Sequence, residues 1–526
     1  MEMNYLPLPQ TREDITVLLL EYQRAWRLRA VESIELSSEL WAEHKREIHV
    51  NPLYSVARKP HGRRNHVPDL RRLMDRIPKD EKERVDLILP ITALPRVPIL
   101  DMHITVAGEE VYRLPLWEGA LLHSRYLMNL AEKAGLDAIS PEVSMLLAAQ
   151  FYYPSYGYEL KLAEYEKMTR YPNSWWRRVK FLCRKVDPMQ EYLNSQLSFT
   201  PSDATYGDWK KIQEDISGIV KGYEPEDYKS PTEKPLIALP QFAKEFTRRR
   251  REILTEEVAT AALNQLRSRL QAAQNREDPV QAKYAERFLR TYAGFGLRWN
   301  VFARCNVPSD KPFVITVNEK RPITFTRKRS KKPNRNPNAH LFVGKTAWKL
   351  VTFRDAETNH VSIRVSDTAV RLAHWVGNKQ VLADKCMPTQ KMPDEEEKTS
   401  ELYVRHDSFE DRDERLWVKC HLRLSRLSSW MLTFTIGITL TGLGLLWWRG
   451  IGEYHSSGTG KGLTAKDAAV ILVPVAFAAA TLLARESSTL GMRLRRVRQT
   501  MLLLSLFSLL GSAFILYFLH HVKGGQ

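Results

Sequence analysis

Three long apolar runs dominate the hydrophobicity pattern, and all of them lie near the C-terminal end of the chain. They cover residues 428–448, 468–484 and 501–519, and none contains a charged residue. A helix rises about 1.5 Å per residue, so roughly 20 apolar residues cross the about 30 Å hydrocarbon core of a bilayer. The first and third runs reach that length, whereas the second is shorter and contains Pro474. The pattern predicts a C-terminal bundle of three transmembrane helices.

The first forty residues carry the spacing of an amphipathic helix. Thr11 and Asp14 are three residues apart, as in a capping box at a helix N-terminus. Apolar residues then recur near the 3.6-residue period from Ile15 to Leu40, with charged residues between them. This pattern predicts one helix of about 35 residues, or two helices with a break.

The helical period gives way to alternation further along the chain. Residues 100–106 alternate apolar and polar side chains and are followed by a turn at 107–110, which predicts a β-hairpin near 99–114. Helices are predicted again at 115–134, from Pro141 behind a capping Ser140, at 240–274 and at 279–292. Residues 150–235 are rich in aromatic residues and proline and show no assignable period.

Strand patterns return after residue 300. The sequence predicts one hairpin from 313–317 and 323–326, and another from 350–353 and 360–365. The resulting organisation is α+β, a large soluble region of mixed helices and strands followed by the membrane bundle. Its predicted parts are a mainly helical region at 1–300, a small β-sandwich or sheet at 301–385, a charged linker at 386–427 and the three transmembrane helices at 428–519.

Composition adds a strong positive charge to this picture. Lysine and arginine outnumber aspartate and glutamate 79 to 61, which gives a net charge of +18 and a pI near 9.6. Such a charge favours anionic partners, and beside a membrane anchor the nearest ones are lipid headgroups. The four cysteines are scattered without a close pair, which excludes a common zinc-site pattern and fits a reducing compartment.

Basic residues alternate in number between the segments that flank the apolar runs. Segments rich in them are retained on the cytoplasmic side of a membrane. The two rich segments carry Arg415, Lys419, Arg423 and Arg426 before the first run, and Arg485, Arg493, Arg495, Arg496 and Arg498 before the third. The two poor segments carry Arg449, Lys461 and Lys466 after the first run, and Lys523 after the third. This alternation predicts a multi-pass plasma-membrane protein with a cytoplasmic N-terminal region and an external C-terminus.

Clusters of basic residues are candidates for contact with anionic lipid, each worth about 1 kcal/mol near a charged surface. The alternative is a solvated protein surface, and nucleic acid is the less favoured ligand because no aromatic-interleaved RNA-binding motif accompanies them. The candidate residues are Arg248, Arg249, Arg250, Arg251, Arg327, Lys328, Arg329, Lys331, Lys332, Arg493, Arg495, Arg496 and Arg498.

Motifs for catalysis, cofactors or metals are not found in the sequence. Residues 339–346 match a relaxed phosphate-loop pattern, but a polar loop precedes them and a strand pattern follows, so Gly344 and Lys345 are interpreted as a turn or bulge. His44 and His49 are five residues apart, whereas zinc-binding histidines on a helix are four apart. A catalytic site assembled from distant residues stays an alternative.

The segment LPITALPRVPILDMHITVAGEEVYRLPLWEG, the later NAHLFV and the C-terminal runs together resemble a group of uncharacterised membrane proteins of actinobacteria. The resemblance implies an architecture, an α+β region before C-terminal spans, and no functional residues. We therefore expect a bacterial membrane-anchored interaction or sensor module, with homo-oligomerisation through the spans as one of its contacts. The alternatives are a membrane-perturbing effector in stress or phage defence, and a membrane-tethered enzyme.

Overall fold

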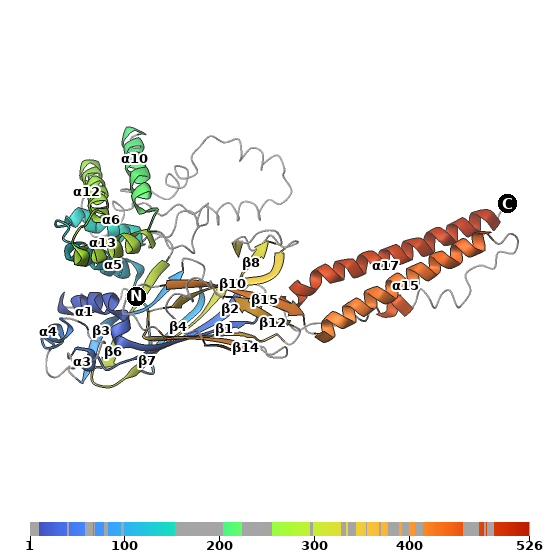
Figure 1. Cartoon of the computed structure of the whole chain (residues 1–526), viewed down its shortest axis with the longest axis horizontal. Helices are drawn as coiled ribbons and strands as arrows, with labels where there is room; N and C mark the ends of the chain where they lie inside the picture. Colours follow the sequence, from blue (N-terminus) through green and yellow to red (C-terminus); the bar gives the residue numbers. More distant parts are fainter. Residues whose placement is uncertain are drawn as a thin grey trace, which may run out of the picture.

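The protein has a mixed α+β architecture, which we describe from a computed structural model (Figure 1). A β-structure forms the middle of an elongated molecule, with most helices at one end and two long helices projecting from the other. The structure describes residues 10–152, 203–223, 255–327, 333–334, 343–376, 389–391, 399–405, 414–455, 473–477, 480 and 489–524, apart from short gaps at 39–40, 58–66, 68, 78–82, 96–98, 295–297, 354, 368–369 and 425.

The largest sheet has eight strands in the order β13-β14-β11-β1-β2-β7-β4-β5. The pair β1–β11 is parallel, and the other described pairs in this sheet are antiparallel. Its strands are β1 (Arg27–Leu36), β2 (Trp41–Val50), β4 (Leu100–Val106), β5 (Glu109–Val111), β7 (Phe313–Pro322), β11 (Thr358–Val365), β13 (Thr389–Lys391) and β14 (Thr399–Arg405).

A five-stranded sheet and a two-stranded sheet complete the β-structure. The five-stranded order is β12-β15-β10-β8-β9, and β3 pairs with β6 in the smaller sheet. The strands are β3 (Arg84–Pro95), β6 (Arg298–Pro308), β8 (Thr324–Arg327), β9 (Pro333–Asn334), β10 (Val343–Phe353), β12 (Val370–Val376) and β15 (Glu414–Leu424). The chain passes between the two larger sheets after β7 and again at Asp355, between β10 and β11.

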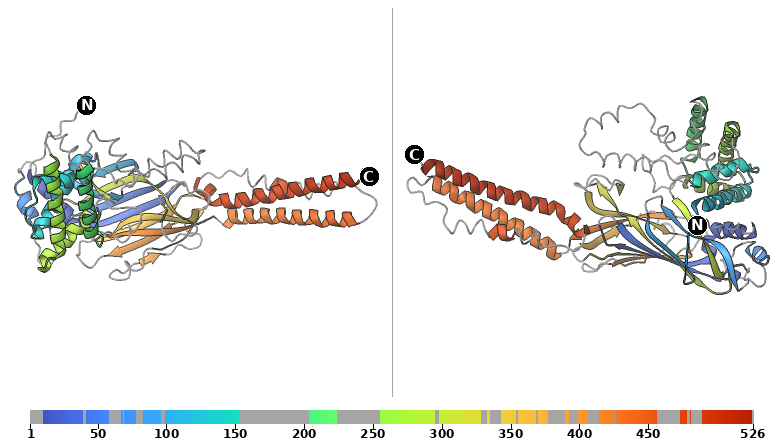
Figure 2. Two further views of the ribbon diagram at one scale, coloured as in Figure 1. Left: turned by 90° about the horizontal axis from the view of Figure 1, so that it is seen from above. Right: turned by 180° about the vertical axis from the view of Figure 1, so that it is seen from behind.

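Helices gather at the end of the sheets opposite to the long helix pair (Figure 2). Two apolar cores hold this part together, one among the larger helices and one where the eight-stranded sheet meets β3, β6 and the first helices. The helices are α1 (Gln10–Glu21), α2 (Gln23–Trp26), α3 (Leu53–Ala57), α4 (Leu70–Met74), α5 (Leu116–Lys133), α6 (Pro141–Tyr152), α10 (Asp203–Val220), α12 (Glu256–Gln274) and α13 (Pro279–Gly294).

The long N-terminal helix that the sequence predicts is only partly present. Helix α1 ends at Glu21, and the short helix α2 and strand β1 occupy Gln23–Leu36, where the prediction continued the helix to Leu40. In β1 the residues Ala30, Glu32, Ile34 and Leu36 are buried in alternation, so the strand has an inward face that includes a charge. Glu32 interrupts the alternation of apolar and polar residues from which a strand is predicted.

Both hairpins predicted after residue 300 are also wrong. Strands β7 and β8 belong to different sheets, as do β10 and β11, because the chain crosses between sheets at both places. The stretch predicted as a charged linker at 386–427 contains three strands, β13, β14 and β15. Pairing with partners distant in sequence, such as β11 with β1, stabilises strands whose own pattern is weak.

Other predicted elements are confirmed. Strands β4 and β5 form the hairpin, closed by the two-residue turn Ala107–Gly108. Helices α5 and α13 lie where expected, and the backbone N–H of Val143 donates to Ser140 Oγ at the start of α6.

Candidate membrane-crossing helix pair and buried charge row

Two C-terminal helices are long and apolar enough to cross a membrane. They are α15 (Arg426–His455) and α17 (Thr489–Gly524), with candidate spans at Trp430–Gly452 and Gln499–Leu516. Only 28% and 22% of these stretches are buried in the protein, unlike the core helix of a soluble protein. Of the second predicted run, 468–484, the structure describes 473–477 and 480, so the described residues provide two candidate spans and do not support three.

The two helices pack along a seam with heptad spacing. Buried positions recur at intervals of three and four residues on both helices, as in a left-handed coiled coil. These positions are Leu432, Thr435, Thr439, Gly442 and Leu446 on α15, and Leu502, Ser505, Leu509 and Ser512 on α17.

Contacts across the seam fix the relative direction of the helices. Trp447 Nε1 donates a hydrogen bond to Ser512 Oγ at 3.1 Å. One turn further along both helices, a Cβ added at Gly450 would lie 2.6 Å from Leu516 Cδ2. The residue numbers of both partners rise together, so α15 and α17 run parallel, and Figure 1 shows both pointing away from the sheets.

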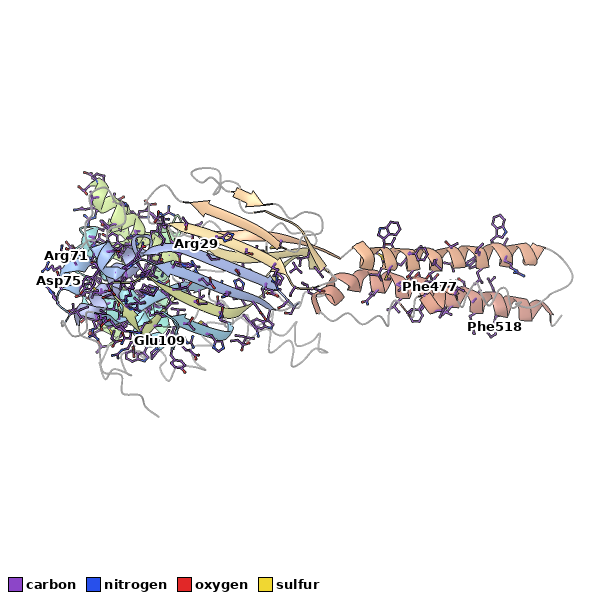
Figure 3. The ribbon with its side chains drawn as sticks, turned by 90° about the horizontal axis from the view of Figure 1, so that it is seen from below. Arg29, Arg71, Asp75, Glu109, Phe477 and Phe518 are labelled. Atoms are coloured by element: carbon purple, nitrogen blue, oxygen red, sulfur yellow. The ribbon has the colours of Figure 1, made fainter. Side chains whose placement is uncertain are left out.

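The outer surface of the pair is strongly apolar. Figure 3 shows side chains projecting outward along both helices, and among the most exposed are Trp430 (73%), Trp448 (83%), Leu504 (69%) and Phe507 (69%). The two tryptophans are separated by about 27 Å along the axis at 1.5 Å per residue, close to the hydrocarbon thickness of a bilayer. Tryptophans at both boundaries of an apolar stretch are typical of helices in lipid.

Three hydroxyl groups of the seam donate within their own helices. Thr435 Oγ1 donates to the Met431 carbonyl, Thr439 Oγ1 to the Thr435 carbonyl and Ser505 Oγ to the Leu502 carbonyl, each at 2.8 Å. Such bonds satisfy these hydroxyl donors without water. The hydroxyl of Ser512 instead accepts across the seam from Trp447, so these described groups contribute to the packing of the pair.

Basic residues gather where the pair meets the sheets. Strand β15 leads directly into α15, and the start of α17 lies against β15. The predicted lipid-contact residues Arg493, Arg495, Arg496 and Arg498 fall in the turns of α17 before its apolar stretch. Arg327 lies at the end of β8, in the five-stranded sheet. The remaining predicted contacts, Arg248, Arg249, Arg250, Arg251, Lys328, Arg329, Lys331 and Lys332, lie outside the described residues.

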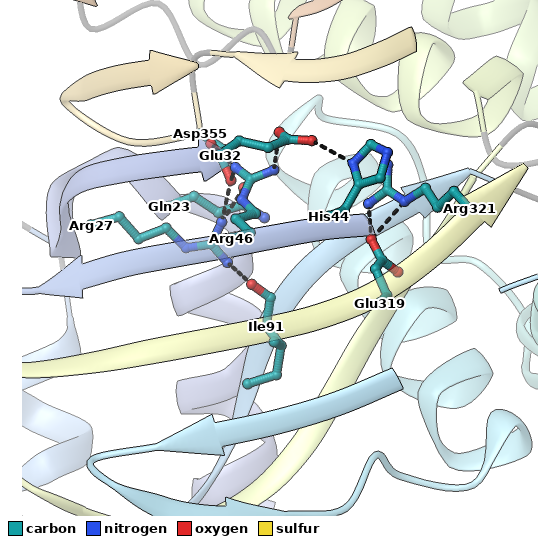
Figure 4. Close-up of polar contacts among 9 residues, drawn as sticks. All are labelled: Gln23, Arg27, Glu32, His44, Arg46, Ile91, Glu319, Arg321 and Asp355. Carbon is teal, nitrogen blue, oxygen red and sulfur yellow. Dashed lines mark hydrogen bonds and ion pairs between the residues drawn. The ribbon is translucent and has the colours of Figure 1, made fainter. Parts of the chain in front are cut away.

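A row of charged side chains is buried beside the eight-stranded sheet (Figure 4). Asp355, in the crossing between β10 and β11, accepts from Arg27 at 2.7 Å and from Arg46 at 2.6 Å. Arg27 also donates to the Pro90 carbonyl at 2.6 Å, which joins β1 to β3. The exposed fractions of the Arg27, Asp355 and Arg46 side chains are 1%, 3% and 5%.

The row continues across β1, β2 and β7. Glu32 lies opposite Arg46 in the register, with an ion pair of 3.7 Å, and its other oxygen is 3.4 Å from His44 Nδ1. His44 lies opposite Glu319 on β7, and Glu319 accepts from Arg321. Glu32, His44, Glu319 and Arg321 are all buried.

The described residues of the row pair basic with acidic side chains. Arg27 and Arg46 contact Asp355, Arg46 and His44 lie near Glu32, and Arg321 donates to Glu319. Removing one partner of an ion pair this deeply buried strongly destabilises the fold, because the other charge is left buried without compensation. We therefore interpret the row as a structural feature that joins the eight-stranded sheet to β3 and to the connection between β10 and β11. Sequence reasoning missed it, and the available signal was a charge at an inward position of an otherwise alternating strand, as at Glu32.

Three features of the described residues bear on metal and catalytic chemistry. These residues contain no group of three or more histidine, cysteine or acidic side chains that could hold a metal ion. Burial raises the pKa of the Cys305 thiol to about 12, so little reactive thiolate forms at neutral pH. His123 lines a small depression with Asn300, Phe151 and Phe302, but the lining includes neither a carboxylate nor a nucleophile.

Comparison of the chain with protein-family models, with curated proteins and with solved structures finds no match. The fold and the two features described above are therefore the basis for assigning a function.

Proposed function

We propose that this chain is a multi-pass membrane protein whose C-terminal helices anchor an α+β interaction or sensor module to the cytoplasmic face of the plasma membrane. The observation that carries the proposal is the parallel pair α15–α17, which directs apolar side chains outward and packs small and hydroxyl side chains inward. A soluble protein that exposed this surface would aggregate, whereas lipid solvates it.

The parallel direction of the pair supports a return crossing between the two helices. His455 ends α15 at the far end of the pair, and Thr489 begins α17 beside the sheets. If both helices cross a bilayer in the same direction, the chain between them crosses back. The apolar run at 468–484 is the segment suited to this crossing, which gives three spans and an external C-terminus.

Anionic lipid is the partner that the position of the basic residues favours. The arginines at 493, 495, 496 and 498 precede the apolar part of α17 by one to two turns, at the depth of the headgroups. Arg423 and Arg426 lie at the corresponding boundary of α15. This collar of basic residues holds the sheets close to the membrane surface and orients the module.

Reporter fusions after residues 425, 458, 492 and 526 test the topology. We expect cytoplasmic, external, cytoplasmic and external signals. An external signal at 425 would contradict the cytoplasmic module, and identical signals at 458 and 492 would contradict the return crossing. A fusion at 223, within the described helical part, should match the one at 425.

Lipid preference is tested by purifying the full chain from native membranes and measuring the anionic lipid that copurifies. We expect the variant with alanine in place of all four arginines, Arg493, Arg495, Arg496 and Arg498, to retain several-fold less anionic lipid. The matched control replaces four exposed cations of the helical end of the molecule with alanine: Lys211, Arg267, Lys283 and Arg290. Equal loss in both variants would indicate a nonspecific charge effect and contradict the collar.

A further inference from the structure

One face of α15 remains uncovered by described residues after the seam with α17 is formed. It carries Phe434, Gly437, Thr441, Gly444 and Trp448, which recur at intervals of three and four residues and are all exposed. A Cβ added at Gly437 or Gly444 would meet no described atom within 4 Å. Small residues at this spacing allow another helix to approach closely in a membrane. We name these five residues the outer stripe.

The base of the outer stripe already contacts another part of the chain. The ring of Phe434 meets that of Phe477 edge to face, with 6.4 Å between centroids and an interplanar angle of 81°. Phe477 belongs to a short helical stretch at 473–477, in which Pro474 is buried. This stretch is the described part of the second apolar run.

We infer that the second apolar run, 468–484, docks along the part of the outer stripe from Phe434 to Thr441, antiparallel to α15. The inference rests on the return crossing of the proposed function and names the surface that receives it. The Phe434–Phe477 contact sets the register, because in antiparallel helices one number falls as the other rises. Thr441 is then opposite about residue 470, seven residues along each helix from the ring contact.

Length and composition fit this occupant. The chain between His455 and Thr489 must return along α15, whose 30 residues extend about 45 Å at 1.5 Å per residue. Residues 456–488 are enough for a helical return of that length. The second run is itself rich in small residues, with alanine at 476, 478, 479 and 480, so close approach is possible from both sides.

The competing occupant is the same stripe of a second copy of the chain, since glycine-rich stripes also mediate helix dimers. The two differ in an observable way. Docking of the second run makes contacts within one chain and leaves the outer stripe unavailable for self-association. A second copy makes contacts between chains at identical residues.

Cysteine cross-linking in native membranes separates these outcomes. We expect the full chain with Thr441→Cys and Val470→Cys to form an intramolecular disulfide under mild oxidation. The matched control pairs Val470→Cys with Leu440→Cys, which is exposed on the neighbouring face, and should cross-link several-fold less. A dimer formed by Thr441→Cys alone, or equal cross-linking in both pairs, would overturn the inference.

A steric test uses two glycines at which an added Cβ meets no described atom within 4 Å. Leucine at Gly437, which lies opposite about residue 474 in this register, fills the space for the second run and should lower the thermal stability of the full chain in detergent. Leucine at Gly511 of α17 is the control and should not lower it. Helix propensity alone favours leucine over glycine at both sites. Unchanged stability in the Gly437→Leu variant would therefore contradict occupancy.

The topology fusions keep this inference distinct from the proposed function. Opposite signals at 458 and 492 together with a failed Thr441–Val470 cross-link would overturn the docking and leave the return crossing intact. Identical signals at 458 and 492 would remove the crossing on which the docking rests.

Discussion

The β-structure and the C-terminal helix pair distribute polarity in opposite ways. Between the sheets, Arg27, Arg46 and Asp355 are nearly inaccessible, while the outer face of β1 and β2 is polar. In the helix pair, Trp448 and Leu504 are outside and hydroxyl side chains are inside. One region thus places charge where water is absent, and the other places apolar surface where a soluble protein meets water.

The difference teaches how each region is stabilised. Buried charges in the sheets are tolerated because they are paired: Asp355 accepts hydrogen bonds from Arg27 and Arg46, which are far from it in sequence, and Glu32 lies 3.7 Å from Arg46. In the bilayer that we propose for it, the helix pair would gain nothing from hydrophobic exclusion, so the packing of its leucine, glycine and hydroxyl-bearing side chains and the Trp447–Ser512 hydrogen bond hold it together. The following predictions break or sharpen this comparison.

The largest effect is expected from Asp355→Ala. Removing this carboxylate leaves Arg27 and Arg46 buried without their shared partner, which should lower the free energy of unfolding by about 3–5 kcal/mol. Denaturant unfolding of the full chain in detergent measures it. The control is Lys320→Ala, which removes an exposed pair with Asp101 of the same 2.7 Å length. A loss as small as that of the control would show that the buried row is dispensable.

A charge on the outer face of the helix pair should have the next largest effect. Lysine in place of Leu504, about 9 Å along α17 from Arg498, costs up to about 2.5–3.5 kcal/mol, the value for the centre of a bilayer. We expect a larger fraction of the full chain to be extracted from membranes by alkaline carbonate. Val280 on α13 is exposed to a similar degree, at 62% against 69%. Lysine at position 280 should not change the extracted fraction. An equal extracted fraction for the two variants would contradict a lipid-facing Leu504.

A smaller gain in stability is expected in the hairpin between β4 and β5. Ala107 and Gly108 both have positive φ, +53° and +85°, as in a type I′ turn. Asparagine tolerates this conformation better than alanine, so Ala107→Asn should raise the free energy of unfolding by about 0.5 kcal/mol. Thermal unfolding measures it, with Ala261→Asn, at an exposed position within helix α12, as the destabilising control.

The smallest effect concerns Glu118 near the start of α5. Partial burial raises the pKa of its carboxyl, Glu13 adds to the rise and Arg304 opposes it. A raised folded-state pKa means that the favourable neutral form is lost as pH rises, so the charged form weakens the fold at neutral pH. Glu118→Gln should therefore raise the melting temperature slightly at pH 7, with no difference near pH 4. A constant difference at both pH values would refute this electrostatic origin.

The sequence by itself determined the apolar stretches of the helix pair and several local elements. A long uncharged apolar run has few structural outcomes, so α15 and α17 follow directly from it. The hairpin at 100–111 and the cap at Ser140 were also predictable, because turn and cap chemistry involve neighbouring residues.

Only the tertiary structure decided the pairing of the sheets and the buried charge row. Asp355 is 328 residues from Arg27 and 309 from Arg46, and no local pattern connects them. Glu32 is a charged residue at a buried position of β1. It interrupts the apolar alternation of the strand, so the segment was predicted as helix from its sequence. The parallel direction of α15 and α17 was likewise invisible, because it depends on side chains that meet across the seam, such as Trp447 and Ser512. Local chemistry fixes what neighbouring residues can do, whereas partners distant in sequence are chosen by the packing of the whole chain.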